Sequence, residues 1–231
     1  MSMIIPKWSA PSFVKACTFA HPTQTHVHAK NHPKAFQACI QQKFEFQKPA
    51  IILEQIHSNI CIDVDDSSER RGDALITKKP HQTLLIQTAD CLPILICHRY
   101  QPQIANIHAG WRGLDLGIIE NTFAKLPDSP KDYIAWIGPA ICKDCYEVGL
   151  EFKEQFLQHH PELNEHFHQK KHWHFDLAGA AETLLKNLGV SEIVQSQTCT
   201  FENTNLFSYR RQKEHASRLA TMIWLETKND H

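Results

Sequence analysis

Apolar runs of strand length recur along the chain. Residues 84–88 have the length and composition of a buried strand, and residues 94–97 and 104–108 repeat the pattern. The gaps between residues 76 and 107 are of hairpin length, which favours antiparallel pairing. The same reasoning predicts further strands at residues 13–20, 50–54, 74–76, 133–137 and 193–195.

Other segments space their apolar residues as a helix does. In residues 116–126, one face carries Leu116, Ile119, Phe123 and Leu126. Residues 151–159 and 177–188 are amphipathic, and residues 216–226 are predicted to form a final helix. The irregular order of strands and helices favours an α+β fold with central mixed or antiparallel sheets over a regular βαβ winding. With 231 residues and no linker or repeat, we expect one domain spanning residues 1–231.

Composition excludes several classes of partner. The formal net charge is −1, so no general basic field invites nucleic acid. No apolar run reaches the about 18 residues of a membrane span, and the first residues lack the order of a signal peptide. The eight cysteines are dispersed, which is typical of free thiols in a reducing compartment. We therefore expect a cytoplasmic protein without membrane or nucleic-acid partners.

Three predicted strand ends carry metal-ligating side chains, namely His57, Cys91 and His108. Three protein ligands with an open fourth position are typical of catalytic zinc. The separations match no local zinc motif, and other roles stay open. Cys91 could be a small core residue, and the histidines could be hydrogen-bonded turn residues.

Charged residues surround these three positions. Arg112 lies between Gly110 and Gly113 and could grip a phosphate or carboxylate, or simply face solvent. Asp73 and Asp90 could orient a ligand histidine, act as acid or base, or cap a turn.

Further positions are candidates for substrate binding or redox chemistry. Tyr146, Phe207 and Arg210 could form walls suited to a base or sugar phosphate, although a buried aromatic corner is the alternative. Cys142 and Cys145 form a CxxC pair. Without a second pair or a thioredoxin-like setting, no functional use of it is predicted.

Several motifs together resemble one known family. They are QIH (55–57), GDALIT (72–77), TADCLP (88–93), HAGWRG (108–113), IGPAI (137–141), CYEVG (145–149), FDL (175–177) and FSYRR (207–211). This order is similar to that of the bacterial laccase-domain family over roughly residues 50–226. Its members were first called multicopper polyphenol oxidases and were later reassigned as zinc-dependent purine nucleoside phosphorylases with adenosine deaminase side activity. Some are also called peptidoglycan editing factors.

The resemblance implies a fold and a site. The fold would be an α+β sandwich with sheets in the middle and helices outside, and His57, Cys91 and His108 would be the zinc ligands. The substrates would be a nucleoside and phosphate, and under this reading we expect Arg112, from its residue type, to hold the phosphate. Two segments depart from the family pattern, residues 21–28 and 211–216, so that substrate contacts from them are not carried over.

Copper is the less consistent metal. A multicopper oxidase needs a blue-copper site and a trinuclear cluster built from His-x-His pairs. Such pairs occur at residues 26–28, 166–168 and 172–174, but none is joined to a cysteine-containing copper motif.

With the resemblance taken into account, three reaction classes remain open. The first is phosphorolysis of purine nucleosides: adenosine, inosine or, as a further candidate, methylthioadenosine. The second is metal-assisted hydrolysis, covering deamination and the editing of amino-acid amides in cell-wall precursors, with Asp73 or Asp90 as proton carrier. The third is a metal-free cysteine hydrolase using Cys91 and His108. A monomer and a homodimer remain equally open.

Overall fold

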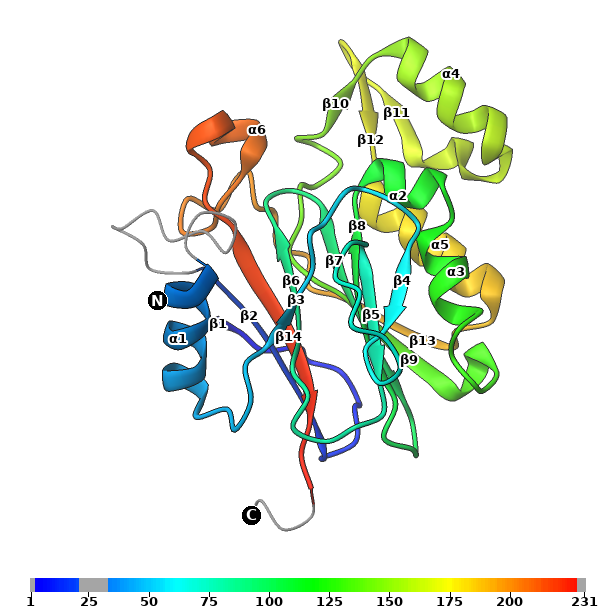
Figure 1. The fold of residues 1–231 in the computed structure, drawn as a ribbon. Coiled ribbons are helices and arrows are strands. Elements are labelled where there is room, and N and C mark those ends of the chain that lie inside the picture. The colour runs from blue at the N-terminus through cyan, green and yellow to red at the C-terminus, as the bar shows by residue number, and fades with distance from the viewer. Residues whose placement is uncertain (1–2, 21–32, 228–231) are drawn as a thin grey trace.

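A computed structural model describes residues 3–20 and 33–227 (Figure 1). Within these ranges the strands form two large sheets and one small sheet. The first large sheet has the order β1 (Met3–Ile4), β2 (Val14–Ala20), β14 (Leu219–Leu225), β6 (Leu84–Thr88), β3 (Ile51–Ile52). The second has the order β13 (Glu192–Gln195), β9 (Tyr133–Ile137), β7 (Leu92–His98), β8 (Ile104–Ala109), β5 (Ala74–Thr77), β4 (Cys61–Asp63). The small sheet has the order β10 (Glu147–Val148), β12 (Trp173–Phe175), β11 (Phe167–Gln169).

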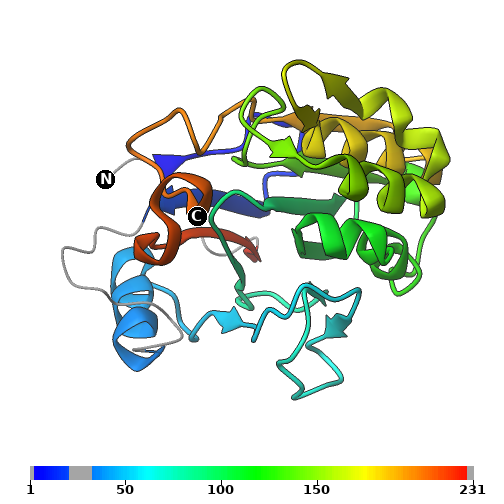
Figure 2. The same cartoon turned by 90° about the horizontal axis from the view of Figure 1, so that it is seen from above.

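Helices lie outside the two large sheets. They are α1 (Pro33–Phe44), α2 (Trp111–Asp115), α3 (Ile118–Phe123), α4 (Leu150–His159), α5 (Leu177–Leu188) and α6 (Tyr209–Gln212). Short 3₁₀ turns cover Pro130–Asp132, Pro161–His166 and Lys213–His215. Helix α1 lies beside the β1-β2-β14 side, whereas α2, α3 and α5 lie beyond the other large sheet (Figures 1 and 2). The expected α+β sandwich with external helices is therefore confirmed.

Alternation along the strands divides the core into layers. In β6, Leu84 and Ile86 pack between the two large sheets, whereas Leu85 faces the layer that contains Ile40 of α1. On the far side of the second large sheet, alternate residues of β7 pack with Ile119 of α3 and with α5. Each large sheet is thus buried on both faces, which explains why its strands are continuous apolar runs.

The last predicted helix was wrong. Residues 219–225 form β14, which pairs antiparallel with β2 on one side and with β6 on the other. Ile223 faces the space between the sheets and Met222 faces the α1 side. When a segment is apolar on both faces, its periodicity does not tell a strand from a buried helix. Residues 219–225 form a strand because they pair with a neighbouring strand on each side.

The helix predicted over residues 116–126 is shorter than expected, since α3 covers only Ile118–Phe123. Helix α2 ends at Asp115, and Gly117 takes a left-handed φ of 79° before α3 begins. Leu116 is consequently exposed, contrary to the prediction, whereas Ile119, Phe123 and Leu126 are buried as expected. Other predicted elements agree closely, with β6, β9 and α5 matching residue for residue.

Two expectations from composition have structural counterparts. No helix among the described residues is long and apolar enough to cross a membrane. The cysteines whose side chains are described are all free thiols: Cys17, Cys61, Cys91, Cys97, Cys142, Cys145 and Cys199. Residues 21–28, where the sequence departs from the family pattern, lie outside the described ranges, as does the His-x-His pair at 26–28.

Candidate functional site

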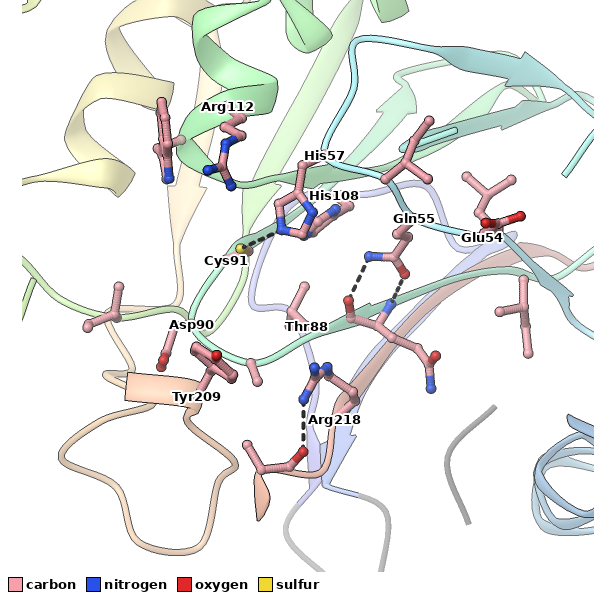
Figure 3. A pocket seen from close by; sticks show the side chains of 18 of the residues that line it. Glu54, Gln55, His57, Thr88, Asp90, Cys91, His108, Arg112, Tyr209 and Arg218 are labelled. Atoms are coloured by element: carbon pink, nitrogen blue, oxygen red, sulfur yellow. Dashed lines mark hydrogen bonds between the residues drawn. The ribbon is translucent and has the colours of Figure 1, made fainter. Parts of the chain in front are cut away.

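Strand pairing brings the three candidate metal ligands together. In the register between β7 and β8, Pro93 lies opposite His108, so Cys91 in the preceding turn lies close to that histidine. His57 approaches from the loop after β3, with its Nε2 3.9 Å from the Cys91 Sγ (Figure 3). One ligand atom from each residue lies within 4.8 Å of the others. The sequence therefore located a real cluster across three distant segments.

Asp73 holds two of these ligands in place. Its side chain is fully buried, and its Oδ1 lies 2.8 Å from Nδ1 of His108. It also accepts hydrogen bonds from the backbone N–H groups of His57 and Ser58 and from the Ser58 hydroxyl. A proton on Nδ1 of His108 leaves Nε2 as the ring nitrogen available to the cluster, which is the arrangement found around metal-bound histidines.

The donor set fits zinc. Tetrahedral zinc with bonds of about 2.0 Å to nitrogen and 2.3 Å to sulfur separates these two ligand atoms by about 3.5 Å. The 3.9 Å between His57 Nε2 and Cys91 Sγ requires only a small adjustment. His57 is exposed, Cys91 partly buried and His108 buried, so the cluster opens to one side. The open side leaves room for a fourth ligand, as in catalytic sites.

Backbone constraints at this site are local and severe. A Cβ on Gly110 would lie 3.0 Å from the Cys91 Sγ and 3.1 Å from Cδ2 of His57. His57 and Asp90 take left-handed φ angles of 59° and 91°, which non-glycine residues adopt at a cost. Only glycine fits at position 110 without displacing two of the three ligands.

Burial and charge shift the pKa values of Cys91 and His108 in opposite senses. Burial alone raises the pKa of Cys91, but the charge of His108 and hydrogen bonds from both histidines lower it to about 6. Burial alone lowers the pKa of His108, but the Cys91 charge and the Asp73 hydrogen bond raise it to about 9. Without a metal the two form a thiolate–imidazolium pair at neutral pH.

Asp90 connects the turn that carries Cys91 to two other loops. Its carboxylate accepts hydrogen bonds from the Thr200 hydroxyl at 2.6 Å, the Ser208 hydroxyl at 3.0 Å and the Arg210 backbone N–H at 2.6 Å. Its carbonyl accepts from the backbone N–H of Ile141. These occupied oxygens favour a positioning role for Asp90 over that of a proton carrier. The same holds for Asp73.

A cavity of about 1490 Å³ lies over the three ligands. Arg112 and Arg218 approach it from opposite sides (Figure 3). The two flanking glycines predict a loop at Arg112, but this residue belongs to the first turn of α2. Its guanidinium lies 4.6 Å from the Trp111 ring. Tyr146 lines the cavity as expected, with the guanidinium of Arg210 5.3 Å from its ring. Tyr209 and Arg218 also line this cavity. The sequence reasoning did not single out Tyr209 within the FSYRR motif, and it assigned Arg218 to a predicted helix.

Two residues near this loop have other environments. Phe207 packs beside Leu206 and Leu219 and is not among the residues that line the cavity, so the buried alternative describes it better. Arg211 donates to the carbonyl oxygens of Thr200, Phe201 and Leu206. The Arg211 guanidinium is therefore occupied by backbone carbonyl groups and is not available to bind an anion.

A second group of metal-ligating side chains was missed. Cys142 and Cys145 lie with Cys199 and Glu202, one ligand atom from each being within 4.8 Å of the others. The sequence argument required a second CxxC pair, whereas the structure supplies a single cysteine from a distant loop. Nothing in the local sequence around Cys199 identifies it as a partner.

Comparison with known proteins identifies the family. Residues 22–226 match the family described as multi-copper polyphenol oxidoreductase laccase. Purine nucleoside phosphorylase YfiH of Shigella flexneri is 32% identical over 240 residues, covering 96% of this chain and 98% of that protein. Purine nucleoside phosphorylase of Haemophilus influenzae is 32% identical over 245 residues, covering 98% of this chain and 100% of that protein.

Solved structures share the fold. The crystal structure of Neisseria meningitidis protein NMB0706 superposes with a TM-score of 0.86 at 31% identity, covering 97% of this chain and 99% of that chain. Bacillus licheniformis protein YfiH superposes with a TM-score of 0.75 at 21% identity, covering 92% and 93% of the two chains. The chain therefore belongs to the multi-copper polyphenol oxidoreductase laccase family, and its full-length relatives bear the name purine nucleoside phosphorylase.

Proposed function

We propose that this protein is a zinc-dependent purine nucleoside phosphorylase. It converts adenosine, inosine and, as a further candidate, methylthioadenosine into the free base and a ribose 1-phosphate. One observation carries the proposal: His57, Cys91 and His108 meet at a cavity of about 1490 Å³ that an arginine borders. That volume exceeds the about 300–1,000 Å³ of ordinary ligand pockets, so a nucleoside and phosphate fit together.

Each cavity residue has a role in this proposal. Arg112 is exposed, and its planar guanidinium suits two oxygens of one phosphate. Tyr146 offers an aromatic face to the purine, and Arg210, which donates to the carbonyl of Glu147, holds that ring in place. Asp73 and Asp90 position His108 and the Arg210 loop, respectively.

The reaction forms one bond and breaks one. A phosphate oxygen bonds to the anomeric carbon of the ribose while the bond from that carbon to the base breaks, and the base leaves with the electron pair and takes up a proton. Zinc held by His57, Cys91 and His108 would supply a Lewis acid that polarises an oxygen in the cavity. Arg112 holds the phosphate in line with the anomeric carbon.

A deaminase side activity is part of the proposal. His57 is exposed, so the metal side of the cavity is open to water as well as to phosphate. Adenosine would then yield some inosine from the same site. Editing of amino-acid amides in peptidoglycan precursors is the hydrolytic alternative to the nucleoside reactions.

A metal-free reaction is the third candidate. The pKa of Cys91 at about 6 makes its sulfur a thiolate at neutral pH when no metal is bound. A thiolate beside an imidazolium is the arrangement of cysteine hydrolases.

The test is product analysis of zinc-loaded protein with adenosine or inosine, with and without phosphate. We expect adenine and ribose 1-phosphate from adenosine only when phosphate is present, with inosine as the minor product. Chelation or Cys91→Ala should remove both activities. Activity that survives chelation but not Cys91→Ala would favour the cysteine hydrolase. If neither nucleoside is consumed at any phosphate concentration, the phosphorylase proposal is wrong, and release of an amino acid from a muramyl precursor becomes the next measurement.

A further inference from the structure

Three thiols and a carboxylate form a group that is separate from His57, Cys91 and His108 and is not among the residues that line the large cavity. Cys142 and Cys145 belong to the loop between β9 and β10, and Cys199 and Glu202 belong to the loop after β13. The two loops are joined by a parallel bridge between Ala140 and Cys199. The four side chains therefore come together because the backbone pairs, and not through flexible ends.

The geometry of this group matches tetrahedral zinc. All four ligand atoms lie within 4.8 Å of one another. Zinc bonds of about 2.3 Å to sulfur and 2.0 Å to oxygen separate two sulfurs by about 3.8 Å and a sulfur from an oxygen by about 3.5 Å. The Cys145 Sγ lies 3.6 Å from Oε1 of Glu202, already at the required distance.

The surrounding backbone is arranged as around a metal-bound cysteine pair. The N–H groups of Cys145 and Tyr146 both donate to the carbonyl of Cys142, which closes the CxxC turn. The N–H of Cys142 donates to the Cys199 Sγ at 3.4 Å, a contact that stabilises a thiolate. The other loop is held by the bond from Thr200 N–H to the carbonyl of Ala140 at 2.9 Å. Hydrogen bonds within the protein therefore preorganise both loops for metal binding.

We infer that Cys142, Cys145, Cys199 and Glu202 form a second metal site, which binds zinc as a closed, structural ion. Soft thiolate ligands select zinc among the common divalent cations, and four protein ligands leave no open position. Each thiol gives up its proton to solvent as its sulfur bonds to the ion. A hollow of about 320 Å³ bordered by Cys142 and Cys199 gives the ion a way in.

The role of this site is to fasten two walls of the cavity. Tyr146 follows Cys145 directly, and the loop that begins at Cys199 continues to Tyr209 and Arg210. Zinc would cross-link the two segments at their bases, next to the Asp90 hydrogen bonds to Thr200 and Arg210. This inference does not depend on which reaction the cavity catalyses.

The first test counts metal ions. Zinc-loaded protein, freed of excess metal, is analysed by elemental analysis. Wild type should hold about two ions per chain, and Cys142→Ser, Cys199→Ser and Cys91→Ala should each hold about one. Cys97→Ala, which removes a buried thiol outside both groups, is the matched control and should hold as much zinc as wild type.

The second test is spectroscopic and uses the Cys91→Ala protein, in which the group of His57, Cys91 and His108 has lost its thiolate. Cobalt(II) added to this protein should give an intense thiolate-to-cobalt charge-transfer band and the visible bands of tetrahedral cobalt. A further Cys199→Ser change should weaken the charge-transfer band by about a third, since one of three sulfurs is lost. Should wild type hold only the ion that Cys91→Ala removes, with no cobalt band in that variant, the second site is refuted. A Cys142–Cys145 disulfide in protein purified under reducing conditions would refute it equally.

Discussion

The carboxylate of Asp73 lies 2.8 Å from Nδ1 of His108, and both side chains are buried. The same carboxylate accepts the backbone N–H of His57 at 3.0 Å. One buried group therefore sets the position of two of the three candidate metal ligands. Replacing Asp73 should therefore reduce the affinity for the metal, and any loss of activity should follow from that reduced affinity.

Asp73→Asn should weaken zinc binding by about 10- to 100-fold, the usual effect of losing the partner of a ligand histidine. The amide keeps the shape of the side chain but loses the charge that fixes the proton on His108. Competition with a chromophoric chelator measures the affinity. Asp115→Asn, which pairs with the exposed His159 instead, is the control and should not change it. Unaltered zinc affinity in Asp73→Asn would contradict the positioning role.

Acid should destabilise the metal-free protein through the same residue. Burial alone raises the pKa of Asp73, but hydrogen bonds from His108 and Ser58 lower it to about 2. Because an unfolded aspartate has a pKa of about 3.9, the unfolded state binds more protons in this range. The stabilising contribution of Asp73 is therefore present above about pH 4 and is lost as the pH falls through about 2.

Urea unfolding of metal-free protein between about pH 5 and pH 2 measures this contribution. The free energy of unfolding should fall less steeply with acid in Asp73→Asn than in wild type. Identical slopes for the two proteins would mean that Asp73 does not titrate as described.

Gly110→Ala should disturb the metal site without unfolding the protein. The new Cβ would meet the Cys91 Sγ at 3.0 Å and the His57 ring at 3.1 Å, so both ligands must move. Gly149→Ala is a matched control, because both glycines precede a helix with extended φ angles, −73° and −79°, and nothing lies within 4 Å of a Cβ at 149. We expect zinc content to fall at least several-fold in the first variant alone. Equal zinc content in both variants would show that Cys91 and His57 can move to accommodate the Cβ without losing the metal.

Arg112→Lys should weaken the use of phosphate and leave the melting temperature unchanged. Lysine keeps the charge but loses the planar fork that binds two oxygens at once. We expect the KM for phosphate to rise about tenfold, as for the loss of about 1.4 kcal/mol of binding, in steady-state assays. Arg99→Lys, whose partner is Glu192, is the control. A large loss of thermal stability with normal phosphate use would make Arg112 structural.

Asp90→Asn separates positioning from proton transfer. The amide N–H₂ would face the Arg210 N–H or a hydroxyl donor, so the loop from Thr200 to Arg210 loosens. A positioning residue should raise the KM for nucleoside and leave both limbs of the pH–rate profile in place. Loss of one limb would instead make Asp90 the acid or base.

Sequence patterns located the elements whose own residues decide their structure. Strand β6 and helix α5 matched residue for residue, since each carries a clear run or periodicity and α5 ends at Gly189 in a left-handed conformation. Strand β14 was missed because its residues are buried on both faces, and its neighbours β2 and β6 come from distant parts of the chain.

The site was accessible to sequence reasoning only in part. The sequence placed His57, Cys91 and His108 at strand ends, where functional groups gather. In the structure Cys91 directly precedes β7, His108 lies near the end of β8, His57 lies in the loop after β3, and the three come together. Cys199 carries no local signal, because its association with Cys142 depends on the Ala140 bridge between two distant loops. Phe207 was placed in the cavity on residue type alone, which cannot tell an aromatic wall from an aromatic core.

Strand β14 follows every other described element in sequence, yet it lies in the middle of the first large sheet. A nascent chain that has reached only residue 218 would expose the unpaired edges of β2 and β6, on which seven and five backbone pairings await their partner. Such open apolar edges attract other strands, so premature termination or slow synthesis here should produce aggregates instead of a weakened enzyme. Dependence on chaperones during translation would then follow from the order in which the strands are synthesised, although β2 and β6 are both paired in the folded protein.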